Sequence, residues 1–135
     1  MHPKFRKADY LSKQVIGAAI AVHKIMGPGL IESIYQKCLM RELQLLGMRC
    51  ASEVRIPLQY KGAIFDEQLK VDVYVDDCLI VELKAVEVVL PIHKAQTLTY
   101  MKLLDIPIGL LINFHSTLLK HGISRLILAG ADDPT

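Results

Sequence analysis

Two charged residues lie inside an apolar run that has the length and composition of a buried strand. The run is Leu-Ile-Val-Glu-Leu-Lys-Ala at residues 79–85, and its aliphatic and β-branched residues predict a strand inside a sheet. Because side chains alternate along a strand, Glu82 and Lys84 point to one face. Burying a carboxylate or an ammonium group is costly unless the group is paired or binds a metal. These two charges therefore indicate a functional site.

A second carboxylate, that of Asp72 on the preceding strand, lies on the same face as Glu82 only if the hairpin between the two strands has the right loop length. A two-residue loop would place Asp72 on the face opposite to Glu82. A three-residue loop at 76–78 pairs Val75 with Leu79 and places Asp72 directly across from Glu82. Three-residue hairpin loops are common, and we predict this register. It brings the two carboxylates and the lysine together.

Two carboxylates on adjacent strands, with a lysine two residues after the second, suit metal-dependent cleavage of phosphodiester bonds. Carboxylate oxygens bind Mg²⁺ or Mn²⁺, which usually keep several waters and accept phosphate oxygens. Such an ion lowers the pKa of a bound water and offsets charge that develops on the phosphate. A nearby lysine positions the water or stabilises that charge.

The rest of the chain predicts the elements that would hold these residues. Pro57 lacks a donor, which suggests that its strand lies at an edge of the sheet. The near-continuous apolar run at 106–114 suits a strand that is covered on both faces. In chain order we predict helices over about 9–25 and 31–46, strands over 51–59, 65–75 and 79–85, a helix over 91–104, and strands over 106–114 and 123–128.

Some polar residues on the predicted helices have two interpretations. Glu32 lies in the first turn of its helix, where the helix dipole favours a carboxylate whether or not a site is present. Tyr35 would either orient Glu32 or pack in the core. On the helix over 91–104 a polar stripe is formed by His93, Gln96 and Tyr100, and the apolar side is predicted from Ala95, Leu98 and Leu103. We expect His93 to support the site or lie on the surface, since hard cations prefer oxygen.

Composition indicates a globular protein. The 135 residues are 52% hydrophobic and 22% charged, and we expect a single domain over 1–135 with its core at about 10–128. Three cysteines without CxxC spacing argue against a disulfide framework and favour a reducing compartment. With no signal-peptide pattern and no run that could span a bilayer, we expect a cytoplasmic protein without a membrane partner. The formal net charge is +2, and the early cluster of Lys4, Arg6, Lys7 and Lys13 indicates a solvated tail or an arm that touches phosphates.

In order, these residues resemble the pattern of a known superfamily. Asp72, then Glu82-Leu83-Lys84, then Gln96-Thr97-Leu98-Thr99-Tyr100 resembles the D…(D/E)xK…QxxxY pattern of the PD-(D/E)XK nuclease superfamily. The proline that names the superfamily is absent, and Val71 stands before Asp72 instead. The run from Gly29 to Tyr35 is similar to the signature of its small bacterial GxxExxY family.

The resemblance implies an α/β fold with a restriction-endonuclease-like core of helix, three-stranded antiparallel meander, helix and strand, preceded by an extra N-terminal helix. Asp72 and Glu82 would be ligands of Mg²⁺ or Mn²⁺, and Lys84 would be the catalytic lysine. Glu32 would be an additional acidic residue that serves both the metal and catalysis. Gln96 and Tyr100 match the helix that supports the catalytic residues.

Two functions from different classes remain. The first is a Mg²⁺- or Mn²⁺-dependent nuclease that acts on DNA or RNA, which the intact acidic and lysine set favours. The second is a non-catalytic module on a nuclease fold that binds nucleic acid or protein, which the small size, mild charge and few aromatic residues favour. A homodimer fits either function, since apolar surface on helices and edge strands invites pairing.

Overall fold

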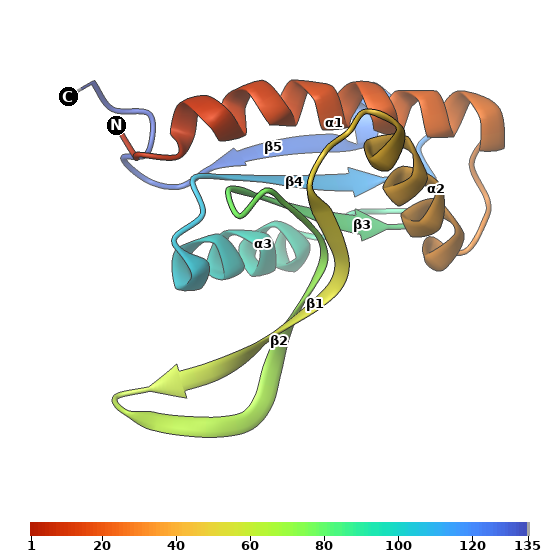
Figure 1. Cartoon of the computed structure of the whole chain (residues 1–135). Helices are drawn as coiled ribbons and strands as arrows, with labels where there is room; N and C mark the ends of the chain where they lie inside the picture. Colours follow the sequence, from red (N-terminus) through yellow and green to blue (C-terminus); the bar gives the residue numbers. More distant parts are fainter. Residues whose placement is uncertain (135) are drawn as a thin grey trace.

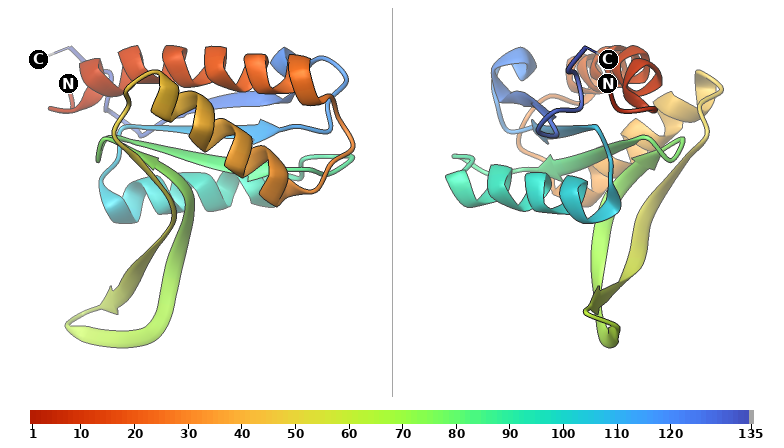
Figure 2. Two further views of the ribbon diagram at one scale, coloured as in Figure 1. Left: turned by 45° about the vertical axis from the view of Figure 1, so that its right-hand side comes forward. Right: turned by 90° about the vertical axis from the view of Figure 1, so that its left-hand side faces the viewer.

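The structure, a computed structural model, describes residues 1–134. A five-stranded sheet in the order β1-β2-β3-β4-β5 forms its centre. Helices α1 and α2 cover one face of the sheet and α3 covers the other (Figures 1 and 2). Within the described residues, no helix is both long and apolar enough to cross a membrane. The elements are α1 (Phe5–Met26), α2 (Glu32–Leu45), β1 (Cys50–Tyr60), β2 (Ala63–Val75), β3 (Leu79–Lys84), α3 (Pro91–Leu104), β4 (Ile108–Asn113), a 3-10 turn η1 (Leu119–Gly122) and β5 (Ile123–Ile127).

The connections between the strands confirm the predicted α/β architecture. β1, β2 and β3 form an antiparallel meander, and α3 leads into β4, which pairs in parallel with β3. β5 then pairs antiparallel to β4. The strand that contains Pro57 is an edge strand, as its missing N–H donor predicted. The core of helix, meander, helix and strand follows the extra N-terminal helix α1.

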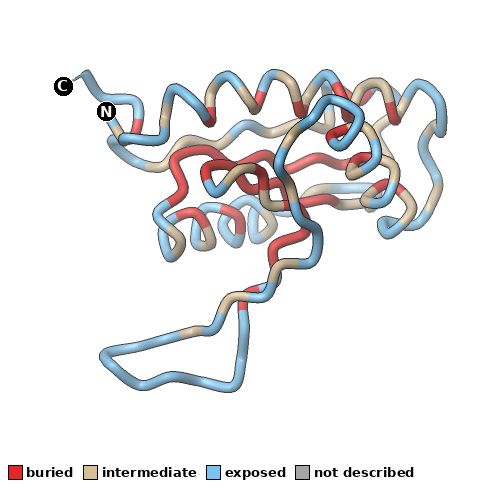
Figure 3. Tube along the Cα trace, viewed as in Figure 1, coloured by how far each residue is buried: buried red, intermediate tan, exposed pale blue. Residues whose placement is uncertain are grey.

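Apolar side chains on the two faces of the sheet form separate clusters. Leu79, Val81 and Leu83 of β3 pack on the face that α1 and α2 cover, while Ile80 packs on the face that α3 covers. Every residue of β4 is buried, which confirms the prediction of a strand covered on both sides (Figure 3). The charges at the end of β3 therefore lie beside two central strands, β3 and β4, whose side chains are almost all buried.

The predicted apolar side of α3 is wrong. Thr97 and Met101 are the buried residues of this helix, whereas the predicted residues Ala95, Leu98 and Leu103 are exposed. The reason lies in β4, where Gly109 leaves room for the helix. A Cβ atom on Gly109 would lie only 2.7 Å from the Met101 sulfur. The Thr97 and Met101 side chains fill this space, so this face of α3 turns inward.

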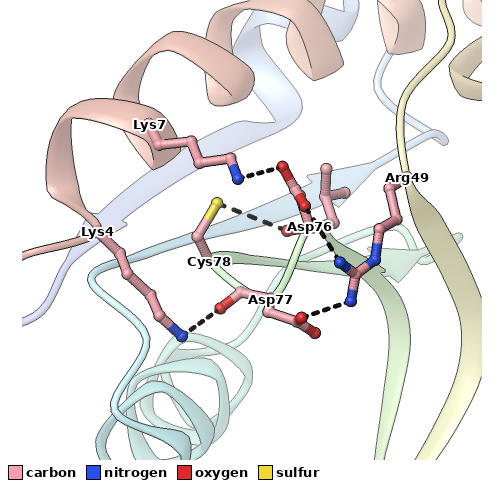
Figure 4. Close-up of polar contacts among 7 residues, drawn as sticks. Lys4, Lys7, Arg49, Asp76, Asp77 and Cys78 are labelled. Carbon is pink, nitrogen blue, oxygen red and sulfur yellow. Dashed lines mark hydrogen bonds and ion pairs between the residues drawn. The ribbon is translucent and has the colours of Figure 1, made fainter.

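The basic start of the chain is not a free tail, because α1 begins at Phe5 and its first turn docks on the β2–β3 turn. Lys7 Nζ lies 2.6 Å from Asp76 Oδ2, and Lys4 Nζ donates to the Asp77 carbonyl at 2.8 Å. Arg49 donates to the Asp77 carboxylate at 2.7 Å (Figure 4). Asp76 and Asp77 have φ values of 48° and 55°, the left-handed region that a tight turn requires. These contacts hold the turn that sets the hairpin register.

Candidate active site where β2 and β3 separate

The β2–β3 hairpin has the predicted register, and its paired segment is short. Val75 pairs with Leu79 across a three-residue turn, and the last pair is Val73 with Val81. Asp72 and Glu82 are the next residues of the two strands, so they lie where the strands begin to separate. Beyond this point β2 pairs only with β1.

Asp72 closes the gap that this separation opens. Its Oδ2 atom accepts a hydrogen bond from the main-chain N–H of Leu83 at 2.8 Å. In a continued ladder a carbonyl of β2 would take that role, and a buried N–H without an acceptor would be costly. The Asp72 side chain therefore replaces the main chain as the partner of β3. This bond fixes the carboxylate beside Glu82.

Glu82 is a buried acid with an unsatisfied oxygen. The residue is 6% exposed, and its Oε1 atom has no hydrogen-bond partner within residues 1–134. Burial and the neighbouring charge of Asp72 raise the pKa of Glu82 from 4.5 to about 9, although Lys84 opposes the rise. Without a cation, this carboxyl group therefore holds a proton at neutral pH.

The two carboxylates fit a hard divalent cation. Mg²⁺ is commonly bound through one or two carboxylates, with waters and substrate phosphates as its other ligands. The unpartnered Oε1 of Glu82 is the kind of buried oxygen that such an ion would satisfy. Within the described residues, no three His, Cys, Asp or Glu side chains are grouped closely enough to bind a metal together. The protein would thus contribute Asp72 and Glu82 as a pair.

Lys84 lies at the end of β3, on the same face of the strand as Glu82. Its positive charge opposes the rise in the pKa values of Glu82 and Glu32. The main chain at Lys84 is held by β4, since its carbonyl accepts a hydrogen bond from Phe114 N at 2.9 Å. Asn113 holds the next segment, with its side chain bonded to both the N–H and the carbonyl of Val86. Sequence reasoning missed Asn113, although it is the one polar side chain in the run at 106–114.

Glu32 is the first residue of α2. Partial burial and the Asp72 carboxylate raise the pKa of Glu32, and Lys84 lowers it. One turn later, Gln36 Nε2 donates to the main-chain carbonyl of Asp72 at 2.8 Å. Gln36 was also missed, and its signal was the four-residue spacing that puts it on the Glu32 face of the helix. α2 thus presents an acid and an amide to the strand that carries Asp72.

Tyr35 packs in the core and does not orient Glu32. Its hydroxyl donates to the Gly27 carbonyl at 2.5 Å and accepts from the Leu30 N–H at 3.1 Å. Its ring stacks on Phe114 with 4.5 Å between the ring centroids. Gly29, within the same loop, has a φ of 98°, which favours glycine. Tyr35 therefore anchors the loop that precedes α2, whose first residue is Glu32.

The remaining predicted residues lie on α3. Gln96 is exposed, and Tyr100 is half-buried against the cluster that contains Val71 and Ile80. His93 Nδ1 accepts a hydrogen bond from the Leu90 N–H at 3.0 Å and so caps the start of the helix. The structure therefore places Asp72 and Glu82 side by side, with Lys84 two residues further along β3. The predicted set of three acidic metal ligands that includes Glu32 is not grouped within the described residues, and roles for Lys84, Gln96 and Tyr100 stay predictions.

The fold and this arrangement define a restriction-endonuclease-like domain, with two carboxylates and a lysine at the separation of two strands. The model of the PD-(D/E)XK nuclease superfamily matches residues 9–126, and the chain belongs to this superfamily. No curated protein and no solved structure matches the chain significantly.

Proposed function

We propose that this protein is a Mg²⁺- or Mn²⁺-dependent nuclease of the GxxExxY type that cleaves phosphodiester bonds in DNA or RNA. The observation that carries the proposal is the buried Oε1 atom of Glu82. This atom has no hydrogen-bond partner within residues 1–134, and the Asp72 carboxylate is a neighbouring charge. Maintaining such a group costs stability, and a cation site compensates for it. The three cysteines, all free, fit a reducing compartment, and we propose the cytoplasm.

Asp72 and Glu82 would hold the ion, and Glu32 would extend the acidic set from α2. The hydrogen bond from Leu83 N–H keeps the Asp72 carboxylate in place, and Gln36 holds the Asp72 main chain. Glu82 must release its proton before it can bind a cation, since its pKa lies near 9. A divalent ion, when bound, supplies charge stabilisation at the scissile phosphate and a more acidic water.

Lys84 would act on the substrate side of the pair. Its position two residues beyond Glu82 puts it on the same face of β3, and the residue is partly exposed. There it would position the attacking water or stabilise negative charge on the phosphate. We propose that Gln96 and Tyr100 support the site from α3.

Calorimetry with Mn²⁺ and Mg²⁺ tests the metal site directly. We expect wild type to bind, and Asp72→Asn and Glu82→Gln to lose binding. Asp132→Asn, a change at an exposed acid near the C-terminus, is the matched control and should bind as wild type does. If wild type fails to bind at millimolar metal, the proposed metal site is wrong.

Cleavage assays test the reaction. Wild type should cleave single- or double-stranded DNA or RNA in Mn²⁺ or Mg²⁺, and Lys84→Ala should retain metal binding while losing cleavage. Metal binding without cleavage of any of these substrates would favour the alternative, a non-catalytic module on a nuclease fold. Electrophoretic mobility shifts with the same nucleic acids would then test that module.

A further inference from the structure

The distal half of the β1–β2 hairpin projects from the sheet without cover. We define the arm as residues 56–69. It extends on the side of the sheet that α3 covers, and most of it is exposed (Figures 2 and 3). Every residue from Ala63 to Gln68 is exposed. An isolated two-stranded hairpin is only marginally stable in water, so an arm of this kind gains from a covering surface.

An apolar stripe runs from a core cluster out along the arm. Val54 pairs with Val71, Ile56 pairs with Leu69, and both β1 residues pack against the cluster beneath α3. Farther along, the arm carries the apolar side chains of Leu58 and Tyr60 on β1 and Phe65 on β2. Tyr60 pairs with Ala63 near the tip, and Phe65 lies where the register of the hairpin shifts. α3 covers the base of the stripe, but Tyr60 is 62% exposed and Phe65 is 43% exposed.

The outer face of α3 is a second apolar stripe without cover. Ile92 and Leu103 are 65% and 55% exposed, and Leu98 is 39% exposed. Ile92, Ala95 and Leu98 follow one another at intervals of three residues, and Leu103 lies on the same side of the helix. None of these residues contributes to the buried face of α3.

The two stripes differ in the sign of their net charge. The arm carries two acids, Asp66 and Glu67 on β2, and one base, Lys61 in the loop at its tip. Exposed lysines Lys94 and Lys102 accompany the α3 stripe, and no acid lies between Pro91 and Leu104. Apolar surfaces bordered by opposite charges are complementary.

We infer that the arm of one copy packs on the outer face of α3 of a second copy, and that the exchange is reciprocal. A two-fold axis makes each copy give one arm and receive one, so that the same contact is buried twice. The arm begins at the strand that carries Asp72, and α3 follows the strand that carries Glu82 and Lys84. Each candidate active site therefore lies beside the interface in this dimer.

Charge reversal with the full-length protein tests this dimer. One variant carries Asp66→Lys and Glu67→Lys on the arm, and the other carries Lys94→Glu and Lys102→Glu on α3. We expect wild type to sediment as a dimer at micromolar concentrations. For each variant alone, the dissociation constant of the dimer should rise at least about tenfold. A mixture of the two variants should dimerise as wild type does, because both arm–α3 contacts then join opposite charges.

Two further variants test the apolar part of the contact. Phe65→Asp on the arm should weaken the dimer, and Ile25→Asp, at a residue 76% exposed on α1, should not. Circular dichroism verifies that each variant is folded. A monomeric wild type, a dimer that neither charge reversal weakens, or a mixture that stays monomeric would overturn the inference. Metal binding by Asp72 and Glu82 is measured separately, so failure of the dimer and failure of the nuclease proposal are distinguishable.

Discussion

The Asp72 carboxylate accepts a hydrogen bond from the main-chain N–H of Leu83, with 2.8 Å between Oδ2 and N. The bond forms directly after the last pair of the β2–β3 ladder, Val73 with Val81. The same carboxylate raises the pKa of Glu82 through its charge. Asp72 thus has a structural role in the sheet and an electrostatic role beside Glu82, and substitution can separate the two.

Asp72→Asn keeps an oxygen acceptor for Leu83 N–H, whereas Asp72→Ala leaves this buried N–H without a partner. We expect Ala to lower the free energy of unfolding by about 1–3 kcal/mol relative to Asn, the usual cost of a buried unsatisfied donor. Urea denaturation followed by circular dichroism measures the difference. Both variants should lose Mn²⁺ binding. Equal stability of the two variants would show that the Leu83 bond is not needed for folding.

The raised pKa of Glu82 predicts a pH-dependent stability. In the unfolded chain this carboxyl titrates near 4.5, while in the folded protein its pKa is about 9. Between these values the folded state holds a proton that the unfolded state has lost, so stability falls as pH rises, by about 1.4 kcal/mol per pH unit for a fully protonated group. The contribution is complete below pH 4.5 and is lost as pH passes 9.

Thermal unfolding in EDTA across this pH range tests that prediction. Glu82→Gln has no such proton to lose, so its melting temperature should decline less with pH than that of wild type. Metal binding should also release a proton, and Mn²⁺ affinity should therefore rise with pH up to about 9. If the melting temperatures of wild type and Glu82→Gln change equally with pH, the raised pKa of Glu82 is contradicted.

The close contact between Gly109 of β4 and helix α3 predicts that a larger residue at this position destabilises the protein. In Gly109→Ala the new Cβ would lie 2.7 Å from the Met101 sulfur and 3.1 Å from the Thr97 methyl. We expect a loss of about 1–3 kcal/mol, since overpacking moves α3 or forces Met101 from its rotamer. Gly17→Ala is the control, because no atom lies within 4 Å of its new Cβ on α1. It should stabilise by about 0.5–1 kcal/mol. Equal effects in chemical denaturation would refute the close approach of α3.

Much of the site was predictable because the sequence allows few registers for the hairpin that carries Asp72 and Glu82. The turn at 76–78 allows two parities, and only one of them brings Asp72 to the Glu82 face of β3. The strand β4 was likewise indicated by its own near-continuous apolar run. Such features are encoded by neighbouring residues, so the sequence alone indicates them.

What the sequence did not predict depends on partners distant in the chain. The inward face of α3 is decided by the space above Gly109, and its residues include threonine as well as methionine. The early lysines pair with a turn about seventy residues away, as the bond from Lys4 to Asp77 shows. The four-residue spacing puts Gln36 on the Glu32 face of α2, but its partner is a main-chain carbonyl, which no residue type marks. These partners follow from tertiary packing and not from periodicity.

Gln36 predicts an effect on metal binding from outside the acidic set. Its amide donates to the Asp72 carbonyl at 2.8 Å, and it thereby ties α2 to the point where β2 leaves β3. In Gln36→Ala the Asp72 main chain loses this tie, and supporting bonds of this kind are commonly worth about 10–100-fold in metal affinity. Calorimetry should show weaker Mn²⁺ binding with an unchanged stoichiometry of binding. Gln44→Ala, an exposed residue two turns further along α2, is the matched control and should bind as wild type does. An equal affinity of Gln36→Ala and Gln44→Ala would mean that Asp72 is held by its Leu83 bond alone.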